Sequence, residues 1–577
     1  MGGMPAWLLG SLRGYRRSWL RRDLVAGLTV WAVLIPESLA YASIAGVSPV
    51  IGLYAAIPAL LLYPLLGSSR HLVVGPMSAT AALSAGVVGG IVSNGSGEFP
   101  AYTAGLAIAV GTVAVLAGLL RLGFLANFVS EPVLKGFIVG MALVIIVGQL
   151  PKLFGIEGGE GNFFQKLWAV VAALGETNGW SALVGLACLA LVLVLRRTAP
   201  LVPGSLAAVV LGIVLAVLLD LEDRGVSVVG HIDAGLPAPS VPDLDAASDI
   251  PLLLSGAAGV MLVGFAEGLG AAKTYARRDG YRIDANRELA GLGAANLGSG
   301  LFNGMVVNGS LSKTAVNGGA GARSQVSGWT VAALTVLTLL ILTPLFAELP
   351  EPALAAVVIA AVIELVDVGG LRRLYEVNTA ALASIYGRAA RADFICAVGA
   401  MLGVLFFDTL PGLLIGVVLS VVLLLARTAH PHVAVLGRVA GGTGQWVDIA
   451  RDSGSSPVDG VVVVRVESPL YFANADAVQD RLLELAAADG VRALVLDAAT
   501  VPSVDVTAAG MLRDTETELA ARGVRLLAVG DVGQVRDVLR RAGAARVVDR
   551  LYPTVDAAVA ATSPGEGEVT GDGAARR

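Results

Sequence analysis

Cysteine, histidine and charged residues are all scarce in this chain of 577 residues. The two cysteines, Cys188 and Cys396, lie in apolar stretches without the spacing of a disulfide or a metal site, as is typical of small buried hydrophobic residues. The four histidines are scattered, and we expect neither a metal site nor a cofactor. Charged residues make up 15% of the chain and hydrophobic residues 55%, which excludes an ordinary soluble globular protein and indicates an integral membrane protein.

Apolar segments follow one another from residue 24 to residue 427. Several are too short to cross a bilayer alone, which is tolerated only where irregular backbone is buried in protein or lines a cavity. Fourteen segments predict an α-helical polytopic membrane protein with two repeats of seven elements, and an odd number places the repeats in opposite orientations. The expected spans are 24–43, 50–66, 75–92, 101–119, 128–149, 167–195 (broken), 202–220, 251–272, 286–300, 309–319, 325–347, 352–367, 392–407 and 409–427.

Basic residues gather in alternate loops between these spans. Arg196 and Arg197 follow the sixth span and Arg277 the eighth, whereas the intervening loops are acidic. By the positive-inside rule, the N-terminal segment 1–22 lies in the cytoplasm. This segment has five arginines and no compact apolar stretch typical of a cleavable signal peptide. We therefore expect a multi-pass protein of the inner or plasma membrane with a cytoplasmic N-terminus.

Two short segments that interrupt the apolar pattern form the candidate site. Leu72–Ala82 reads LVVGPMSATAA, and Met305–Asn317 reads MVVNGSLSKTAVN. Each looks like an extended piece that enters a short helix, and such interrupted segments at corresponding places in two halves indicate the midplane site of an inverted-repeat transporter. The alternative of two ordinary surface loops is disfavoured by the apolar flanks. Helix N-termini inside a membrane offer free N–H groups and positive dipole ends to an anion.

Lys313 adds a full positive charge to these helix ends. A lysine costs roughly 2.5–3.5 kcal/mol at the centre of a membrane, so we expect it to face a water-filled cavity or a bound anion. Tyr41 is a less specific candidate that is equally compatible with a core position. The predicted anion-binding residues are Pro76, Met77, Ser78, Ala79, Gly309, Ser310, Leu311, Ser312, Lys313 and Tyr41.

Glu37 is an acid in the middle of the first span. It directly follows Pro36, which removes a backbone hydrogen bond and kinks the helix. A carboxyl group is stable there when it is protonated or faces water. We therefore interpret Glu37 as an acid that takes up a proton when the anion binds; the alternative is a protonated acid bonded to a neighbouring helix.

Glu267 is the second acid inside an apolar span, and small residues surround it. Gly264, Gly268 and Gly270 allow its helix to pack closely against the two site segments. Three interpretations remain open: a proton or cation site, a salt-bridge partner of Lys313 in the empty state, or a hydrated acid near the cytoplasmic end of the span.

The composition changes after about residue 430, which ends the expected transport domain 23–430. Residues 431–458, with the glycine-rich run Gly437–Gly444, are interpreted as a linker and the start of a soluble region. Residues 459–561 alternate strand and helix patterns, which predicts a small α/β domain. The tail 562–577 is rich in glycine and glutamate and is predicted to be disordered.

Three stretches, LTVWAVLIPESLAYASIAGVSPVIGLYAA, LLGSSRHLVVGPMSATAAL and GSLSKTAVN, together with the α/β domain, resemble the SulP anion permeases. The resemblance covers nearly the whole chain. It implies a seven-plus-seven inverted repeat with core and gate domains as in uracil permeases, and an elevator-like movement. It also implies an anion between the third and tenth elements, a cytoplasmic STAS domain and a homodimer.

The resemblance also assigns roles to individual residues. Ser312 and Lys313 stand where the family commonly has Ser-Arg, which keeps the charge but loses the bidentate fork of arginine. Glu37 stands where many members carry glutamine, and Glu267 where several carry an acid linked to proton or sodium coupling. A branch that couples to sodium tends to have aspartate there, so these two acids favour a proton as the coupling ion.

In the STAS-like domain, Asp505 and Thr507 lie at the start of a predicted helix. Thr507 is placed where bacterial anti-sigma antagonists carry a phosphorylatable residue, which makes it a candidate regulatory site. The favoured alternative is that Asp505 and Thr507 simply cap the helix.

These features predict a secondary active transporter of small anions rather than an enzyme, with a sulfate-type oxyanion as substrate and a proton as coupling ion. Alternatives are a dicarboxylate (fumarate or succinate) or bicarbonate transporter, and an anion exchanger or channel. A further alternative is a membrane-tethered STAS scaffold that signals without transport. The expected partners are the anion, the proton, the lipid bilayer and a second copy of the chain, with no nucleic acid.

Overall fold

The computed structural model describes residues 9–12, 14–93, 96–124, 130–199, 202–230, 235–244, 249–376, 391–407, 409–439, 444–452, 454–530, 533–549 and 551–562. The chain divides into two compact units, Met1–Tyr375 with Asp393–Leu419, and Glu376–Ala392 with Ser420–Arg577. The first eight residues of the segment 1–22 and the predicted disordered tail from residue 563 lie outside the described residues.

The first unit is built almost entirely of helices, and nine helices of the described ranges are long and apolar enough to cross a bilayer. The first half holds α1 (Leu20–Ile44), α2 (Pro49–Leu66), α3 (Ser78–Gly89), α4 (Phe99–Leu119), α5 (Glu131–Phe154), α6 (Phe163–Ala173), α7 (Gly179–Thr198) and α8 (Gly204–Leu219). The second half holds α9 (Asp249–Asp279), α10 (Ala285–Leu301), α11 (Leu311–Gly319), α12 (Val326–Leu337), α13 (Thr343–Ala347), α14 (Glu351–Val362), α15 (Val368–Glu376), α17 (Ala392–Phe407) and the first part of α18 (Thr409–Ala429), whose residues from Ser420 on belong to the second unit.

Each expected span coincides with one or more of these helices. The break expected within 167–195 lies between α6 and α7, where the side chain of Asn178 caps α7 by accepting hydrogen bonds from the N–H groups of Trp180 and Ser181. The expected span 325–347 is interrupted by a π-helical turn, Thr338–Leu342, between α12 and α13. Hydropathy locates these helices because the thickness of the bilayer sets their length.

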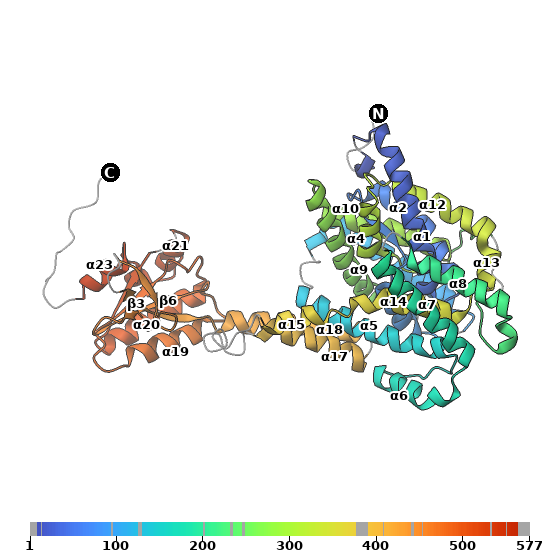
Figure 1. Cartoon of the computed structure of the whole chain (residues 1–577). Coiled ribbons are helices and arrows are strands. Elements are labelled where there is room, and N and C mark those ends of the chain that lie inside the picture. The colour runs from blue at the N-terminus through green and yellow to red at the C-terminus, as the bar shows by residue number, and fades with distance from the viewer. Residues whose placement is uncertain are drawn as a thin grey trace. The chain divides into compact units, whose positions relative to one another are not determined.

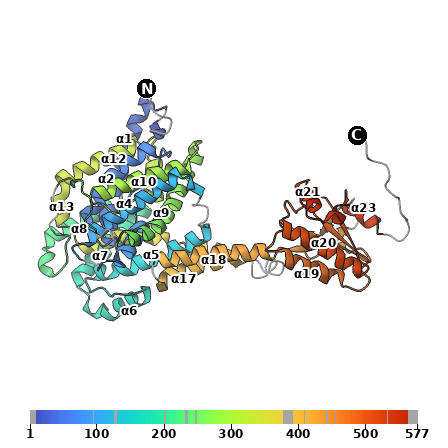
Figure 2. The ribbon, with the colours of Figure 1, turned by 180° about the vertical axis from the view of Figure 1, so that it is seen from behind.

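The helices of this unit pack in two groups. α4 and α10 lie side by side (Figures 1 and 2), and α1, α2, α9 and α12 pack with them or with one another. α5, α7, α8 and α14 form the second group. Each group takes helices from both halves of the chain, which is the arrangement of core and gate in an inverted repeat.

Two three-residue strands cross at the centre of the first group. β1 (Val73–Gly75) pairs antiparallel with β2 (Asn308–Ser310), with Val73 opposite Ser310 and Gly75 opposite Asn308. All six residues are buried. The pairing satisfies backbone groups that would otherwise be unpaired inside the membrane. Each strand leads into a short helix, β1 into α3 and β2 into α11, so the two helices leave the crossing in opposite directions.

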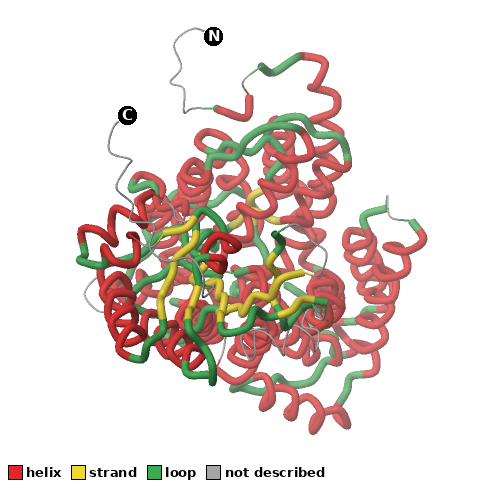
Figure 3. The backbone as a smooth tube through the Cα atoms, turned by 90° about the vertical axis from the view of Figure 1, so that its left-hand side faces the viewer, coloured by secondary structure: helices red, strands yellow, loops and turns green. Residues whose placement is uncertain are grey.

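The second unit contains a mixed β-sheet (yellow in Figure 3) with the strand order β4-β3-β6-β7-β8-β9, and β5 pairs with β3. The strands are β3 (Val433–Val439), β4 (Trp446–Asp448), β5 (Ser455–Ser456), β6 (Val461–Val466), β7 (Ala493–Asp497), β8 (Arg525–Val529) and β9 (Leu551–Tyr552). Strands β6 to β9 are parallel and β3 is antiparallel to β6. The helices are α19 (Ala475–Ala486), α20 (Val506–Ala521), α21 (Gly533–Arg541), α22 (Ala545–Asp549) and α23 (Val555–Ala560).

Alternation along the central strands explains why both faces of this sheet are covered. In β6, Val464 and Val466 belong to the core shared with α19 to α22, whereas Val461 and Val463 belong to the core shared with α23. A strand buried on both faces has the continuous apolar sequence VVVV seen here.

Candidate functional site

The site lies where α3 and α11 begin. Pro76 cannot donate a backbone hydrogen bond and holds the chain extended, so that α3 starts only at Ser78. α11 starts directly after β2, and the hydroxyl of Ser310 caps it by accepting a hydrogen bond from the N–H of Lys313 at 3.3 Å. Both helices therefore present their N-terminal ends next to the strand crossing, as expected from the sequence.

Lys313 is completely buried, with 0% of its surface exposed. Its Nζ donates hydrogen bonds to Glu37 Oε2 at 2.8 Å and to the carbonyl oxygen of Pro76 at 3.0 Å. The ammonium group also lies 4.9 Å from the centre of the Tyr41 ring, within the range of a cation–π contact. The lysine thus joins α11 to α1 and to the segment that precedes α3.

Glu37 reaches Lys313 because α1 is held close to the strand crossing. Pro36 is inside α1 and cannot donate to the carbonyl of residue 32, which loosens the helix one residue before the acid. Gly52 of α2 permits the close packing, since a Cβ atom at that position would lie 2.0 Å from the carbonyl oxygen of Ser38. The side chain of Glu37 is buried and forms an ion pair with Lys313.

One of the three interpretations of Glu267, that it is the salt-bridge partner of Lys313, is wrong. The salt-bridge partner of Lys313 is Glu37, not Glu267, because α1 rather than α9 brings a carboxylate to the ammonium group. Glu267 Oε2 is buried without a hydrogen-bond partner among the described residues. As expected, Gly264 and Gly268 let α9 pack against β2, where added Cβ atoms would lie 3.1 Å from the side chain of Asn308; Gly270 has no such contact.

The predicted anion-binding residues form a buried set and an exposed set. Met77, Ser78, Ala79 and Ser310 are buried, as are Pro76, Gly309 and Tyr41. Leu311 and Ser312 are exposed at the first turn of α11, where the hydroxyl groups of Ser310 and Ser312 lie 3.1 Å apart. The first turn of α11 is therefore the accessible part of the candidate site.

Replacing Ser312 with leucine is expected to weaken anion binding without unfolding the protein. The exposed position accepts added volume, but the isobutyl group covers free N–H groups at the helix end. Measurement of the KM for anion uptake beside a thermal unfolding curve checks this, with Ser312→Ala as the control that adds no bulk. A folded Ser312→Leu protein with the KM of the wild type contradicts the placement of the site. The corresponding change at Ser78 is less clean, since that residue is buried and overpacking costs about 1–3 kcal/mol.

Sequence reasoning missed a group of buried polar residues that connect the two halves of the chain. Asp23 accepts hydrogen bonds from the N–H groups of Arg323 and Ser324 and from the Ser324 hydroxyl. Glu288 accepts from the Tyr63 hydroxyl, and from Ser68 and Ser69. These acids lie near span ends, where an exposed position is the ordinary expectation, so no pattern in the sequence distinguishes them.

Asp505 and Thr507 lie at the start of α20 in the second unit. Asp505 Oδ1 accepts a hydrogen bond from the N–H of Ala508 at 2.8 Å, and Oδ2 accepts one from the N–H of Phe472 at 2.8 Å. Asp505 is thus the helix cap, as the capping alternative predicted for this residue. Thr507 is exposed, so its hydroxyl is accessible.

Two discontinuous helices that meet at paired strands inside a polytopic helical bundle define the class of inverted-repeat membrane transport proteins. The family model described as "Sulfate permease family" matches residues 20–388, and the model described as "STAS domain" matches residues 457–558. The chain therefore belongs to the sulfate permease family and carries a C-terminal STAS domain, which confirms the resemblance.

Relatives with similar sequences cover nearly the whole chain. "Probable sulfate transporter MT1781" of Mycobacterium tuberculosis (strain CDC 1551 / Oshkosh) is 37% identical over 556 residues, which are 95% of this chain and 96% of that protein. "Sulfate transporter 4.1, chloroplastic" of Arabidopsis thaliana is 31% identical and covers 94% of this chain and 80% of its own length.

Solved structures share the fold at lower identity. The murine Slc26a9 anion transporter in the inward-facing state matches with a TM-score of 0.84 at 22% identity, over 97% of this chain and 95% of that chain. The transmembrane domain of the cyanobacterium bicarbonate transporter BicA matches with a TM-score of 0.59 at 23% identity, over 70% of this chain and 98% of that chain. At this identity the likeness establishes the fold alone.

Proposed function

We propose that this protein is a secondary active transporter of small anions, with a sulfate-type oxyanion as its substrate. The observation that carries the proposal is the fully buried Lys313 ammonium group at the ends of two short helices inside the membrane unit. A buried cation needs a counter-charge, and an anion that enters this site meets that need together with free backbone N–H groups. Sulfate transporters among the sequence relatives support the choice of substrate.

Glu37 makes anion binding competitive in this proposal. Its carboxylate lies 2.8 Å from Lys313 Nζ and takes the position of a counter-anion. An arriving anion has to displace this carboxylate, and a proton on Glu37 removes its charge and frees Lys313. Anion and proton therefore favour each other's binding, which is the requirement for symport.

The proposal also covers how the protein moves during transport and where it lies in the cell. The core helices carry the site past the gate helices in an elevator-like movement, and the protein acts as a homodimer in the inner or plasma membrane. Segment 1–22 and the STAS domain, residues 459–561, lie in the cytoplasm because the basic loops mark that side. The transport domain comprises residues 23–430, and Thr507 of the STAS domain is a candidate for modification. The prediction of a linker at 431–458 is wrong for most of that range, because β3, β4 and β5 lie within it and β3 pairs with β6 of the sheet.

Uptake into proteoliposomes of labelled sulfate, bicarbonate, fumarate and succinate, measured separately, tests the substrate. We expect sulfate uptake to exceed that of the other three anions. If the protein prefers bicarbonate or a dicarboxylate, the proposed substrate is wrong but the proposed binding site stands. Absence of uptake of all four anions by folded protein favours the signalling scaffold instead.

The coupling ion is tested at Glu267 with the same vesicles. We expect an inward proton gradient to stimulate uptake and a sodium gradient to have no effect, and we expect Glu267→Gln to reduce the stimulation at least about threefold while exchange of anions remains measurable. The reason is that Glu267 Oε2 is buried without a partner, so a proton is the least costly way to remove its charge. Glu267→Asp is the matched control that keeps a carboxylate. Stimulation by sodium, or a Glu267→Gln protein that responds to protons as the wild type does, contradicts this assignment.

A further inference from the structure

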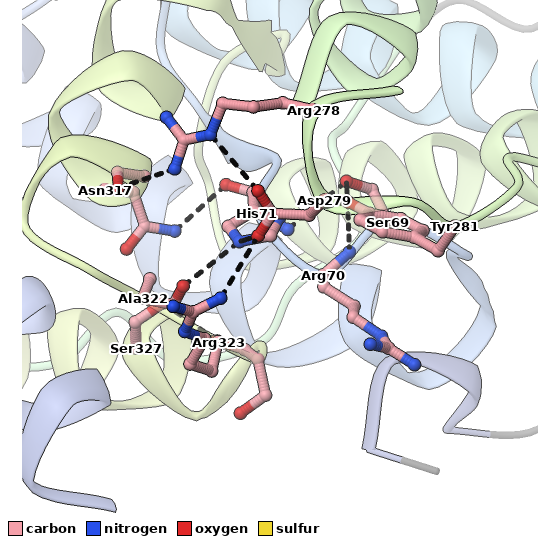
Figure 4. Close-up of polar contacts among 12 residues, drawn as sticks. Ser69, Arg70, His71, Arg278, Asp279, Tyr281, Asn317, Ala322, Arg323 and Ser327 are labelled. Carbon is pink, nitrogen blue, oxygen red and sulfur yellow. Dashed lines mark hydrogen bonds and ion pairs between the residues drawn. The ribbon is translucent and has the colours of Figure 1, made fainter. Parts of the chain in front are cut away.

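His71 is a buried histidine, and Figure 4 shows the polar groups around it. It lies in the segment between α2 and β1. Its Nε2 is 3.0 Å from the carbonyl oxygen of Ala322 and 3.3 Å from Asp279 Oδ2, and its Nδ1 is 3.0 Å from the Tyr281 hydroxyl. Its own carbonyl oxygen accepts a hydrogen bond from Asn317 Nδ2 at 2.9 Å. One residue therefore contacts α9, α11 and the turns that follow each of them.

The neighbours of the imidazole determine which nitrogen carries the proton. The carbonyl of Ala322 and the carboxylate of Asp279 are acceptors, so Nε2 is the donor. Nδ1 then accepts from the Tyr281 hydroxyl. The Tyr281 oxygen in turn accepts from the N–H of Arg70 at 3.2 Å and lies 3.3 Å from the hydroxyl of Ser69, which is free to donate to it. The hydroxyl groups of Ser69 and Tyr281 are thus both satisfied with a neutral His71.

A second proton on His71 disturbs this arrangement. Nδ1 becomes a donor to Tyr281, whose own proton must then turn to Ser69, so the direction of the hydroxyl chain reverses. The charge also adds to Arg278 and Arg323, which lie 3.1 Å and 3.6 Å from the Asp279 carboxylate. Burial lowers the pKa of the His71 imidazole, although the nearby Asp279 carboxylate acts in the opposite direction. His71 is therefore neutral at neutral pH.

Contacts made by this segment set the position of α11 relative to β1. The N–H of Val73 donates to Thr314 Oγ1 at 3.1 Å, one turn before the contact between Asn317 and His71. α11 has nine residues, and these contacts reach it at its fourth and seventh residues. Lys313 lies next to Thr314, and its reach to the carbonyl of Pro76 depends on the register between α11 and the chain through β1.

We propose that His71 is a positioning residue for Lys313: as a neutral imidazole it ties the turn that follows α11, at Ala322, to the end of α9 at Asp279, while its backbone carbonyl accepts the hydrogen bond from Asn317 of α11. This connection keeps α11, which carries Lys313, in a fixed position along β1, which leads to Pro76. The inference rests on the proposed function, because its main readout is anion uptake. It differs from a general stabilising role in affecting anion affinity more than the maximal rate.

The experiment measures KM and Vmax of labelled anion uptake by full-length protein in proteoliposomes, using sulfate or whichever of bicarbonate, fumarate and succinate the wild type takes up. His71→Ala is expected to raise KM about tenfold, as removal of an outer partner of a binding group typically does, with a smaller change in Vmax. His71→Gln keeps an N–H donor for the Ala322 carbonyl and is expected to restore most of the affinity. Tyr281→Phe, which removes only the hydroxyl that donates to Nδ1, is expected to give a smaller shift in the same direction.

Tyr63→Phe is the matched control. It removes another buried hydrogen bond, from the Tyr63 hydroxyl to Glu288 Oε2 at 2.6 Å, without touching α11. We expect its KM to equal that of the wild type. An unchanged KM in folded His71→Ala protein, or equal KM shifts in His71→Ala and Tyr63→Phe, overturns the inference while the wild-type uptake still supports transport.

Hydrogen–deuterium exchange separates failure of the inference from failure of transport. Residues 311–319 are expected to exchange faster in His71→Ala and Tyr281→Phe than in the wild type, with no change in Tyr63→Phe. If the wild type takes up none of the anions, the proposed function fails, yet this exchange pattern still decides whether His71 holds α11. Equal exchange of residues 311–319 in all four proteins refutes the positioning role.

Discussion

Uptake of the labelled anion is expected to disappear when Lys313 is replaced with alanine, whereas Lys313→Arg retains part of it. The structure places the ammonium group where both short helices begin, 3.0 Å from the carbonyl oxygen of Pro76. A hydrogen bond to a charged group contributes about 1.5–3 kcal/mol, so the loss of one such contact alone lowers affinity about 10- to 100-fold. Arginine keeps the charge but is longer and planar, so the fit is impaired.

A control is needed because Lys313→Ala leaves the Glu37 carboxylate buried without its partner. Removing one member of a buried ion pair destabilises a protein by about 3–5 kcal/mol. The double variant Lys313→Ala with Glu37→Gln removes both charges and is expected to fold more stably than Lys313→Ala, yet still to lack uptake. Thermal unfolding and uptake measured on the same preparation distinguish the two effects. Wild-type uptake by the folded double variant would refute Lys313 as the anion-binding group.

Replacing Glu37 with glutamine is expected to separate anion binding from the proton gradient. The amide is close in size to the carboxyl group but carries no charge, so it no longer competes with an anion for Lys313. We expect anion exchange to remain measurable, stimulation by an inward proton gradient to fall at least about tenfold, and KM at neutral pH to decrease. In the wild type, an inward proton gradient is expected to stimulate uptake, because the anion and the proton favour each other's binding in the proposed mechanism.

Initial uptake rates with and without the inward proton gradient check this prediction. Glu364→Gln is a suitable control because it is the same substitution at an exposed acid, paired with Arg196 at 2.8 Å. The control is expected to keep the stimulation by the gradient that the wild type shows. If Glu37→Gln also keeps it, Glu37 is structural and the coupling proton is held elsewhere.

The membrane helices were predictable because apolar length is a local property. The expected spans 50–66 and 392–407 agree with α2 and α17 to within one residue at each end. Both short helices of the site were also expected, since Gly75-Pro76 and Asn308-Gly309 interrupt apolar runs and disfavour a continuous helix there. The register of the strand pair was not predictable, because three-residue strands buried on all sides have no alternating pattern to specify their alignment.

The partner of Lys313 could not be predicted from local sequence patterns. Glu37 and Glu267 both lie in apolar spans, and both were candidates for interaction with the site. Their hydropathy does not say which of them reaches a lysine far away in the chain. Packing decides it: Gly52 lets α2 approach α1 at Ser38, and Gly264 and Gly268 place α9 against Asn308 rather than against Lys313.

The contacts of His71 could not be predicted either, because the sequence presents it as an isolated histidine. Its partners, Asp279, Tyr281, Asn317 and Ala322, are more than two hundred residues away and come together only when the two halves of the chain interlock.

The sequence by itself determined the membrane class, the repeat of seven elements, the STAS domain, the family and the two segments of the site. These follow from composition, the length of apolar runs and local motifs, which neighbouring residues specify. Only the tertiary structure decided that Glu37 forms the ion pair with Lys313, that Glu267 Oε2 has no hydrogen-bond partner among the described residues and that His71 lies between α9 and the turn after α11. Such pairings join residues from opposite halves of the chain, and their energies depend on distances of a few ångströms that close helix packing sets.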